Sequence, residues 1–261
     1  MIHSSSIVGK NAEIHDSTNI GPFCIVGDGV KIGKNNNLIS HVSIVGNTTI
    51  ENNNVFYPFC SIGSDPQDLK FNKEISFLKI GSKNNFRENV TINPGTSGGG
   101  LNTTIDDNCL FMVGSHVAHD CIIKSNVILA NNATLAGHVE IDNNAILGGN
   151  SAIHQFVRIG KYAMIGGMSG VEKDIIPYAL YTGIRENLKS LNLIGLKRKG
   201  LTSNTINEIK KIINIIFDKD KTIENNINNN IVKNSQILEI KEIIEFLNSN
   251  SRRGITTFEN E

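Results

Sequence analysis

Hydrophobic residues recur at every sixth position through most of the chain. With Ile2 as the first residue of a hexad, an aliphatic residue or phenylalanine occupies the first position repeatedly as far as Val171. A six-residue period is typical of a hexapeptide β-helix, in which each hexad forms a short strand and a turn. The first positions are held by Ile2, Val8, Ile14, Ile20, Val26, Ile32, Leu38, Ile44, Ile50, Phe56, Ile62, Ile80, Phe86, Ile92, Ile105, Phe111, Val117, Ile123, Leu129, Leu135, Ile141, Leu147, Ile153, Ile159, Ile165 and Val171.

The other hexad positions support the same interpretation. The fifth position is mostly small or β-branched, and positions three and four are often Asn, Asp or Gly, which tolerate the left-handed backbone of a sharp corner. Three hexads make a triangular coil of about 18 residues, and successive coils stack about 4.8 Å apart. We therefore predict a β-solenoid, although the period alone does not determine its hand. All four cysteines, Cys24, Cys60, Cys109 and Cys121, occupy fifth positions and are expected to be small interior residues.

The repeat is interrupted twice and then ends. Residues 63–79 do not follow the pattern, and the glycine-rich stretch 93–104 shifts its phase, so both are expected to loop outward, the second as a flexible lid or subunit contact. From about residue 187 the apolar spacing becomes helical, with five isoleucines in 206–216 on one face and Thr205 and Glu208 as a capping box. We expect this segment to cover the strand edges of the last coil. The predicted domains are therefore 1–185, a β-helix, and 186–261, a helical domain.

Composition excludes several classes of protein. Lys+Arg and Asp+Glu both total 25, so a zero net charge argues against general nucleic-acid binding. No apolar run reaches the ~18 residues of a membrane helix, and the N-terminus lacks the pattern of a signal peptide. Four cysteines without a CxxC pair fit a reducing, cytoplasmic location.

The coil period brings distant histidines together. Because residues 18 apart stack on one another, positions 119, 137 and 155 are expected along one edge of the solenoid. A histidine titrates near neutral pH, a neighbouring acid can orient its ring, and a glycine amide one coil away can meet a developing oxyanion. This edge is predicted to carry His119, Asp120, Gly137, His138, His154 and Gln155, with His116 on the adjoining wall.

Two other interpretations of these histidines stay open. Histidines on successive coils can bind zinc at a subunit interface, as in the gamma-class carbonic anhydrases, if their nitrogens lie about 2 Å from one metal. Alternatively, they are turn histidines that are solvated or bonded to the backbone. Acid–base chemistry is favoured, because deprotonation of a hydroxyl nucleophile is a common route to acyl transfer.

Six segments resemble one family, the bacterial UDP-N-acetylglucosamine O-acyltransferases. The segments are "IGPFCIVG" at 20–27, "PQDLKF" at 66–71, "HVAHDC" at 116–121, "ILANNATLAGHV" at 128–139, "IHQFVRIG" at 153–160 and "GLKRKG" at 195–200. The resemblance implies a left-handed parallel β-helix and a homotrimer with active sites between neighbouring prisms. It also implies transfer of a 3-hydroxyacyl chain from acyl carrier protein to the glucosamine 3-hydroxyl of UDP-N-acetylglucosamine, the first step of lipid A synthesis, without cofactor or metal.

The resemblance assigns roles to individual residues. His119 matches the general base, Asp120 its support and Gly137 the oxyanion donor. Asp68 matches a sugar-binding residue with Lys70 beside it, and His116, His138, His154 and Gln155 match other substrate-binding positions. Asn192, Arg198 and Lys199 match a nucleotide and carrier-protein surface, which Lys197, Lys210 and Lys211 extend into a basic patch suited to an acidic partner.

Two departures from the family pattern and one position that sets acyl length matter. Lys199 stands where arginine is usual, which keeps the charge but loses a bidentate fork. "INPGT" at 92–96 replaces a more basic "IHRGT", which leaves the role of that strand open. Gly167 matches a position where a bulky residue shortens the accepted acyl chain, so glycine implies room for a longer chain unless Met168 intrudes.

Four alternative functions can be separated by experiment. The related N-acyltransferase carries an N-terminal uridine-binding domain, whereas the repeats here begin at Ile2. An acetyl-CoA-dependent acetyltransferase of the same fold would use a different donor. A metal-dependent hydratase would contain stoichiometric zinc, and a purely structural β-helix would be indifferent to loss of His119. Neither the acyl length nor the choice between a 3-hydroxyl and a 3-amino acceptor follows from the sequence.

Overall fold

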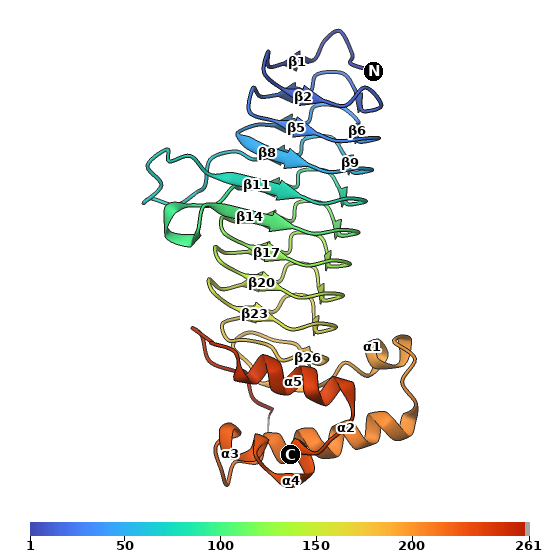
Figure 1. Cartoon of the computed structure of the whole chain (residues 1–261), viewed down its shortest axis with the longest axis vertical. Coiled ribbons are helices and arrows are strands. Elements are labelled where there is room, and N and C mark those ends of the chain that lie inside the picture. Colours follow the sequence, from blue (N-terminus) through green and yellow to red (C-terminus); the bar gives the residue numbers. More distant parts are fainter. Residues whose placement is uncertain (259–261) are drawn as a thin grey trace.

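The chain forms a tall triangular prism of stacked coils with helices gathered at its C-terminal end (Figure 1). The computed structural model describes residues 1–258. Each coil gives one short strand to each of three sheets, and within each sheet the strands from successive coils pair in parallel. We call these sheets the first, second and third faces, in the order in which the chain reaches them. No helix among the described residues is long and apolar enough to cross a membrane.

The strands of the first face are β1 (Ile7–Val8), β4 (Ile25–Val26), β7 (Ser43–Ile44), β10 (Ser61–Ile62), β13 (Thr91–Ile92), β16 (His116–Val117), β19 (Thr134–Leu135), β22 (Ala152–Ile153) and β25 (Gly170–Val171). Those of the second face are β2 (Glu13–Ile14), β5 (Lys31–Ile32), β8 (Asn47–Ile50), β11 (Phe77–Ile80), β14 (Asn102–Ile105), β17 (Ile122–Ile123), β20 (Glu140–Ile141) and β23 (Arg158–Ile159). Those of the third face are β3 (Asn19–Ile20), β6 (Asn37–Leu38), β9 (Val55–Phe56), β12 (Asn85–Phe86), β15 (Leu110–Phe111), β18 (Ile128–Leu129), β21 (Ile146–Leu147), β24 (Met164–Ile165), β26 (Ala179–Tyr181) and β27 (Leu188–Leu191).

The strand register confirms the predicted coil length. Leu135 pairs with Ile153 on the first face, and cross-coil contacts elsewhere also join residues 18 apart. Where the hexad phase breaks, the register absorbs the extra residues, since Ile62 pairs with Ile92 and Ile92 with Val117. The insertions therefore leave the prism without disturbing its stacking.

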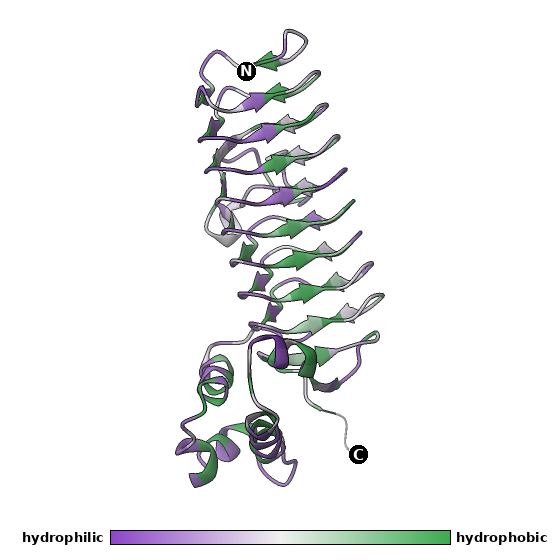
Figure 2. Ribbon diagram, turned by 90° about the vertical axis from the view of Figure 1, so that its right-hand side faces the viewer, coloured by the Kyte–Doolittle hydropathy of each residue, from purple (hydrophilic) through white to green (hydrophobic). Residues whose placement is uncertain are grey.

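The interior consists of the predicted first and fifth hexad positions. From Ile20 to Val171 the first-position residues are buried, as are the four free cysteines. The rings of Phe56, Phe86 and Phe111 stack along the axis, with centroids 4.7 and 4.9 Å apart. Figure 2 shows the coils as a regular column along which hydrophobic and hydrophilic residues alternate. The prism is narrow, so one inward side chain per strand fills it.

The corners depend on the fourth hexad position. Residues there have positive φ in most coils, among them Asn35 (56°), Asn126 (62°) and Asn144 (62°). Asparagine adopts this conformation at lower cost than most residues, which explains its abundance in the chain. The prediction of a left-handed backbone conformation at the corners is thus confirmed. Of the two hexad positions proposed, it is the fourth that has this conformation.

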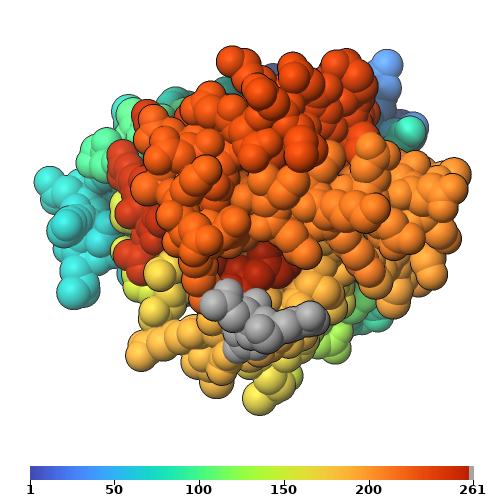
Figure 3. Space-filling view, turned by 90° about the horizontal axis from the view of Figure 1, so that it is seen from below, coloured from blue at the N-terminus to red at the C-terminus, as the bar shows by residue number. Residues whose placement is uncertain are grey.

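The C-terminal segment contains five helices as far as residue 258. They are α1 (Leu193–Arg198), α2 (Ser203–Ile216), α3 (Ile223–Ile227), α4 (Asn230–Lys233) and α5 (Leu238–Asn248). The five isoleucines predicted to face inward on α2 are all buried. These helices lie over the lower end of the prism (Figure 3). The domain boundary at 185/186 stays a prediction.

Two details differ from the sequence prediction. Residues 188–191 are not helical but form β27, which pairs antiparallel with β26 and covers an edge strand that would otherwise have unpaired backbone groups. Thr205 is not the N-cap of α2. Thr202 is, and its hydroxyl accepts a hydrogen bond from the Thr205 N–H at 3.2 Å, so the capping-box prediction is wrong by one turn of the helix.

Helix α5 closes the last coil. Its Glu242 accepts a hydrogen bond from Lys161 Nζ at 2.8 Å and another from the hydroxyl of buried Tyr178. The C-terminal residues then return to the prism, where Ile255 pairs with Asp174. The expectation that this segment covers the end of the solenoid is confirmed.

Candidate active site

His119 and Asp120 lie at the corner between the first and second faces, directly after β16. The Nδ1 atom of His119 is 2.8 Å from Oδ2 of Asp120, and both residues are buried. Asp120 has φ of 59°, so the corner conformation turns its side chain back toward the preceding ring. We call this pair the dyad.

Asp120 is held as a carboxylate. Burial by itself would raise the pKa of Asp120, but hydrogen bonds from His119 and from the side chain and backbone of Thr96 outweigh it, so the pKa lies below its ordinary value. A carboxylate can only accept hydrogen bonds, so the proton of the neutral His119 ring lies on Nδ1. The other nitrogen, Nε2, is then free to take a proton.

Gly137 lies one coil on from His119, against its ring. A Cβ atom on Gly137 would lie 2.4 Å from Cε1 and 2.6 Å from Nε2 of His119. Glycine is therefore the residue that permits the ring to occupy this position. Among the hydrogen bonds of residues 1–258, none uses the Gly137 N–H as donor. This amide is available for an oxyanion.

His138 follows Gly137 at the same corner of the prism. Its ring meets that of His119 edge to face at 5.1 Å and stacks on Phe156 at 4.3 Å, while the Arg252 guanidinium lies 4.8 Å from the Phe156 ring centre. The pKa of His138 is lowered, first by burial and further by the charges of His119 and Arg252, although Asp120 opposes this. Phe156 and Arg252 were not predicted from the sequence. The 18-residue step leads from His138 to Phe156, but no periodicity leads to Arg252.

Asp68 reaches the dyad from the first insertion. Its Oδ2 is 4.0 Å from Nε2 of His119, and its Oδ1 accepts a hydrogen bond from the Lys70 N–H at 3.0 Å. The side chain of Lys70 is exposed. His116, on the first face, bonds through Nδ1 to Thr91 Oγ1 at 2.7 Å, and burial together with nearby His119 lowers its pKa.

His154 and Gln155 lie at the same corner one coil beyond His138. Both are exposed, and His154 Nδ1 lies 3.3 Å from the Gln155 carbonyl oxygen. The coil arithmetic therefore places these two residues correctly, while their substrate-binding role stays a prediction.

The structure does not bring every predicted site residue to the dyad. Asn192, Arg198 and Lys199 line a separate cavity of about 520 Å³ between α1 and the outer surface of the third face. Asn192 also caps α1 by accepting a hydrogen bond from the Gly195 N–H at 2.9 Å. Lys199 pairs with Glu239. On a single chain these residues lie on a different face from the dyad.

Gly167 and Met168 occupy a third location, the corner between the third and first faces. Met168 is 70% exposed with φ of 59°. A Cβ atom on Gly167 would lie 3.3 Å from the Gly149 carbonyl oxygen, a contact that needs only a small shift. An acyl chain starting at the dyad of the same prism would therefore have to cross the first face to reach them.

A metal could in principle use part of this cluster. One ligand atom each from His119, Asp120 and His138 lie within 4.8 Å of one another. Asp120 Oδ2, however, is shared by His119 Nδ1 at 2.8 Å and Thr96 Oγ1 at 2.6 Å. A metal on this oxygen would have to displace hydrogen bonds, so the arrangement favours a hydrogen-bonded dyad.

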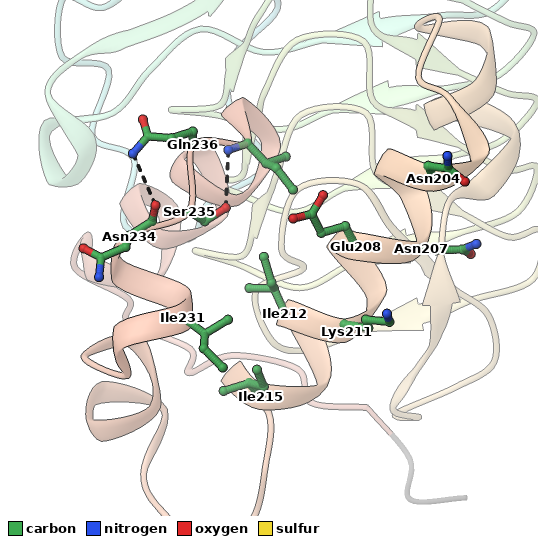
Figure 4. Close-up of a pocket in the computed structure, with 11 residues that line it drawn as sticks. Asn204, Asn207, Glu208, Lys211, Ile212, Ile215, Ile231, Asn234, Ser235 and Gln236 are labelled. Carbon is green, nitrogen blue, oxygen red and sulfur yellow. Dashed lines mark hydrogen bonds between the residues drawn. The ribbon is translucent and has the colours of Figure 1, made fainter.

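A larger groove lies within the helical segment. It has a volume of about 1100 Å³, and Figure 4 shows Ile212 and Ile215 of α2 facing Ile231 across it. Its charged lining residues are Glu208 and Lys211. It contains no dyad like that of His119 and Asp120, so the chemistry lies elsewhere.

The dyad beside a free glycine amide can remove a proton from a hydroxyl and stabilise an oxyanion, the two requirements of acyl transfer. Residues 102–137 match the family model described as bacterial transferase hexapeptide (six repeats), and residues 174–256 match UDP N-acetylglucosamine O-acyltransferase, domain 2. Fold and matches together define a transferase built on a left-handed parallel β-helix.

The relatives narrow this class. The chain is 46% identical over 254 residues to the acyl-[acyl-carrier-protein]–UDP-N-acetylglucosamine O-acyltransferase of Thermodesulfovibrio yellowstonii, covering 97% of this chain and 98% of the relative. The UDP-N-acetylglucosamine O-acyltransferase of Moraxella catarrhalis superposes with a TM-score of 0.94 at 39% identity, covering 98% and 99% of the two chains. The UDP-N-acetylglucosamine acyltransferase of Francisella novicida gives 0.92 at 37% identity, covering 100% and 95%. The chain belongs to the UDP-N-acetylglucosamine O-acyltransferase family.

Proposed function

We propose that the protein transfers a 3-hydroxyacyl chain from acyl carrier protein to the glucosamine 3-hydroxyl of UDP-N-acetylglucosamine, the first step of lipid A biosynthesis. The observation that carries this proposal is the ring of His119, held through Nδ1 by ionised Asp120 and packed with Nε2 against Gly137. The family relationship supports the identity of the two substrates.

His119 is the general base in this reaction. The sugar hydroxyl gives its proton to Nε2 while its oxygen forms a bond to the thioester carbonyl carbon. The Gly137 N–H donates to the oxyanion that develops on the carbonyl oxygen. The C–S bond then breaks, and the imidazolium returns the proton to the departing thiolate. Protons and electrons balance without a cofactor or metal, and the proposal includes neither.

Substrate-binding roles follow from position around the dyad. Asp68, 4.0 Å from Nε2 of His119, suits a sugar hydroxyl beside the one that reacts. Lys70 stands next to it in the insertion. The corner beside Gly137 offers His138, His154 and Gln155 to the rest of the acceptor sugar nucleotide or of the donor thioester, and His116 borders it on the first face.

We infer that neighbouring prisms of a homotrimer share the site. The dyad lies at one corner, whereas the cavity that Asn192, Arg198 and Lys199 line lies over the third face. A single nucleotide sugar can reach both sets when an adjacent chain supplies the second. Gly167 and Met168, at another corner of the prism, would then act on acyl length through the same packing of chains.

The basic residues of the helical segment suit the acidic carrier protein. Lys197 and Arg198 lie in the last turn of α1, and Lys210 and Lys211 lie on α2. Complementary charge speeds such an encounter even when the net charge is zero. We place the enzyme in the cytoplasm, where the four buried free thiols would stay reduced.

The direct test is acyl transfer by the purified protein. UDP-N-acetylglucosamine would be incubated with a mixture of 3-hydroxyacyl carrier proteins of different lengths, and separately with acetyl-CoA. We expect one O-linked 3-hydroxyacyl product by mass spectrometry, whose mass gives the acyl length. Acetyl transfer alone would refute the proposal, and activity restricted to a 3-amino sugar would change the acceptor while leaving the base in place.

A further inference from the structure

The glycine-rich insertion leaves the prism, as expected (Figure 1), and its first residues contact the dyad. After β13 it passes through a short 3-10 helix, Ser97–Gly99, before entering β14. Thr96, at the start of this helix, is buried. Its backbone N–H donates to Asp120 Oδ1 at 2.9 Å, and its hydroxyl donates to Asp120 Oδ2 at 2.6 Å. Both carboxylate oxygens are therefore held by one residue.

The fit between the insertion and Asp120 is tight. A Cβ atom on Gly99 would lie 2.1 Å from Cγ of Asp120, so glycine is needed for this approach. At Gly98, by contrast, the nearest atom to a Cβ is 3.8 Å away. From the other side, the Asp120 N–H donates to Thr103 Oγ1 at 2.8 Å. The backbone N–H and both carboxylate oxygens of Asp120 are thus all hydrogen-bonded.

The first insertion, which carries Asp68, is hydrogen-bonded to the glycine-rich insertion. Glu74 Oε1 accepts a hydrogen bond from the Ser97 N–H at 2.9 Å, next to Thr96. Asn93 Nδ2 donates to the carbonyl oxygens of Ser64 at 2.9 Å and Asp65 at 3.2 Å. The segment that carries Asp68 is therefore connected to the segment that holds the dyad.

We propose that Thr96 is a positioning residue for the reaction, which fixes the Asp120 carboxylate so that it aligns His119 against Gly137, and that the close approach of Gly99 permits this contact. The inference rests on the proposed function, because it assigns a role relative to His119 as base. It gives Thr96 and Gly99, two residues of the glycine-rich insertion, a specific task in the reaction.

The physical reason is that a carboxylate bound by one partner can rotate. Hydrogen bonds to both oxygens remove this freedom and leave Oδ2 in the direction of Nδ1. The ring of His119 has little space under Gly137, so a small rotation of Asp120 would move Nε2 away from the hydroxyl. Misplacement on the order of 1 Å costs catalysis heavily while substrate binding survives.

The test is a double-mutant cycle with Asp120. We expect Thr96→Val to lower kcat about tenfold, with the KM for UDP-N-acetylglucosamine within about twofold, and Thr96→Ser to restore most of the rate because it retains the hydroxyl. Asp120→Asn is expected to lower kcat more, about 100-fold, and Thr96→Val should add less than about threefold to it. Full additivity of the two changes would overturn the proposal.

Two matched pairs separate positioning from simple packing. Thr48 is also a buried threonine of the second face, but its hydroxyl donates to the Val45 carbonyl oxygen and it lies two coils before Thr103. Thr48→Val should therefore retain kcat within about twofold. Gly99→Ala should lower kcat about tenfold or more, while Gly98→Ala should leave it unchanged. Equal effects of the two glycine changes would contradict the role of the close approach at Gly99.

Failure of the positioning role of Thr96 can be distinguished from failure of the proposed function. If His119→Ala retains activity, the base assignment falls. If His119→Ala abolishes activity while Thr96→Val has wild-type kcat, the positioning role alone falls. Circular dichroism and gel filtration on each variant would verify that the prism and its assembly are intact.

Discussion

The imidazole ring of His119 lies so close to the Cα of Gly137 that a methyl group there would approach Cε1 to 2.4 Å. The two residues are one coil apart, and nothing else in the chain brings a histidine nitrogen and a free glycine amide together in this way within residues 1–258. A base and an oxyanion donor therefore share one corner of the solenoid. Their proximity leads to the first prediction.

Gly137→Ala should disable catalysis by displacing the base. The added methyl group would push the His119 ring away from its place, and we expect kcat/KM to fall at least about 100-fold while the fold persists. Gly149→Ala is the control, since a Cβ there meets its nearest atom, the Asn131 carbonyl oxygen, at 3.3 Å. Similar activity of the two variants would show that the close contact is dispensable.

His119→Ala should fold and assemble as the wild type does but lose at least about 100-fold in kcat, the usual scale for a lost general base. The ring is replaced by a small side chain at a corner, so the inward residues of the prism are untouched. Single-turnover acyl transfer would measure the rate, and gel filtration the assembly. Retention of the wild-type rate would refute the assignment.

Glu242→Gln should loosen the attachment of α5 to the last coil. Burial would raise the pKa of Glu242, but hydrogen bonds from Lys161 and Tyr178 outweigh this and lower it from its ordinary 4.5. The stabilisation is thus complete above pH 4.5 and is lost as pH falls through the lower folded pKa. We expect a loss of about 1–3 kcal/mol in urea unfolding near pH 7, with the difference from wild type shrinking at acid pH.

Glu245→Gln provides the control for this ion pair. Glu245 is exposed on the same helix and forms no ion pair within the described residues. Its replacement should change stability by less than about 0.5 kcal/mol. A difference between Glu242→Gln and wild type that stays constant down to pH 2 would show that ionisation of Glu242 is not responsible.

Arg252→Gln should raise the pKa of His138. Burial is the main cause of the lowered pKa, and the Arg252 guanidinium adds to it, whereas Asp120 and Asp68 oppose it. Removing one cation makes protonation of His138 easier, which NMR titration of its ring proton would detect. Arg253→Gln is the control, because Arg253 Nε instead donates to the Glu172 carbonyl oxygen. If the pKa of His138 is the same in Arg252→Gln as in the wild type, the guanidinium over Phe156 has no influence on that pKa.

Much of the fold could be predicted from the hexad period. The inward residues, the coil length, the left-handed corners and helix α2 follow from local pattern, because each coil depends only on its neighbours and repeats one local solution. Strand β27 could not be predicted, because the open edge of β26, and not the local sequence, selects its conformation. The cap of α2 at Thr202 was missed because several threonines and serines compete at that end of the helix.

The candidate site also contains residues that could be predicted from the sequence and residues that could not. Counting by 18 placed Gly137, His138 and Gln155 relative to His119, because the coils in that region have no insertions. Thr96 could not be placed by counting, since the insertion that carries it breaks the register.

The sequence by itself determined which residues face inward and which corner residues lie above one another, because a solenoid converts spacing along the chain into height. Only the tertiary structure decided how the insertions and the C-terminal residues fold back onto that corner. There Thr96 holds Asp120 and Arg252 lies over Phe156, through contacts between segments whose separation follows no period. Such contacts depend on the shape and hydrogen-bonding capacity of the assembled surface, which exists only once the coils have stacked.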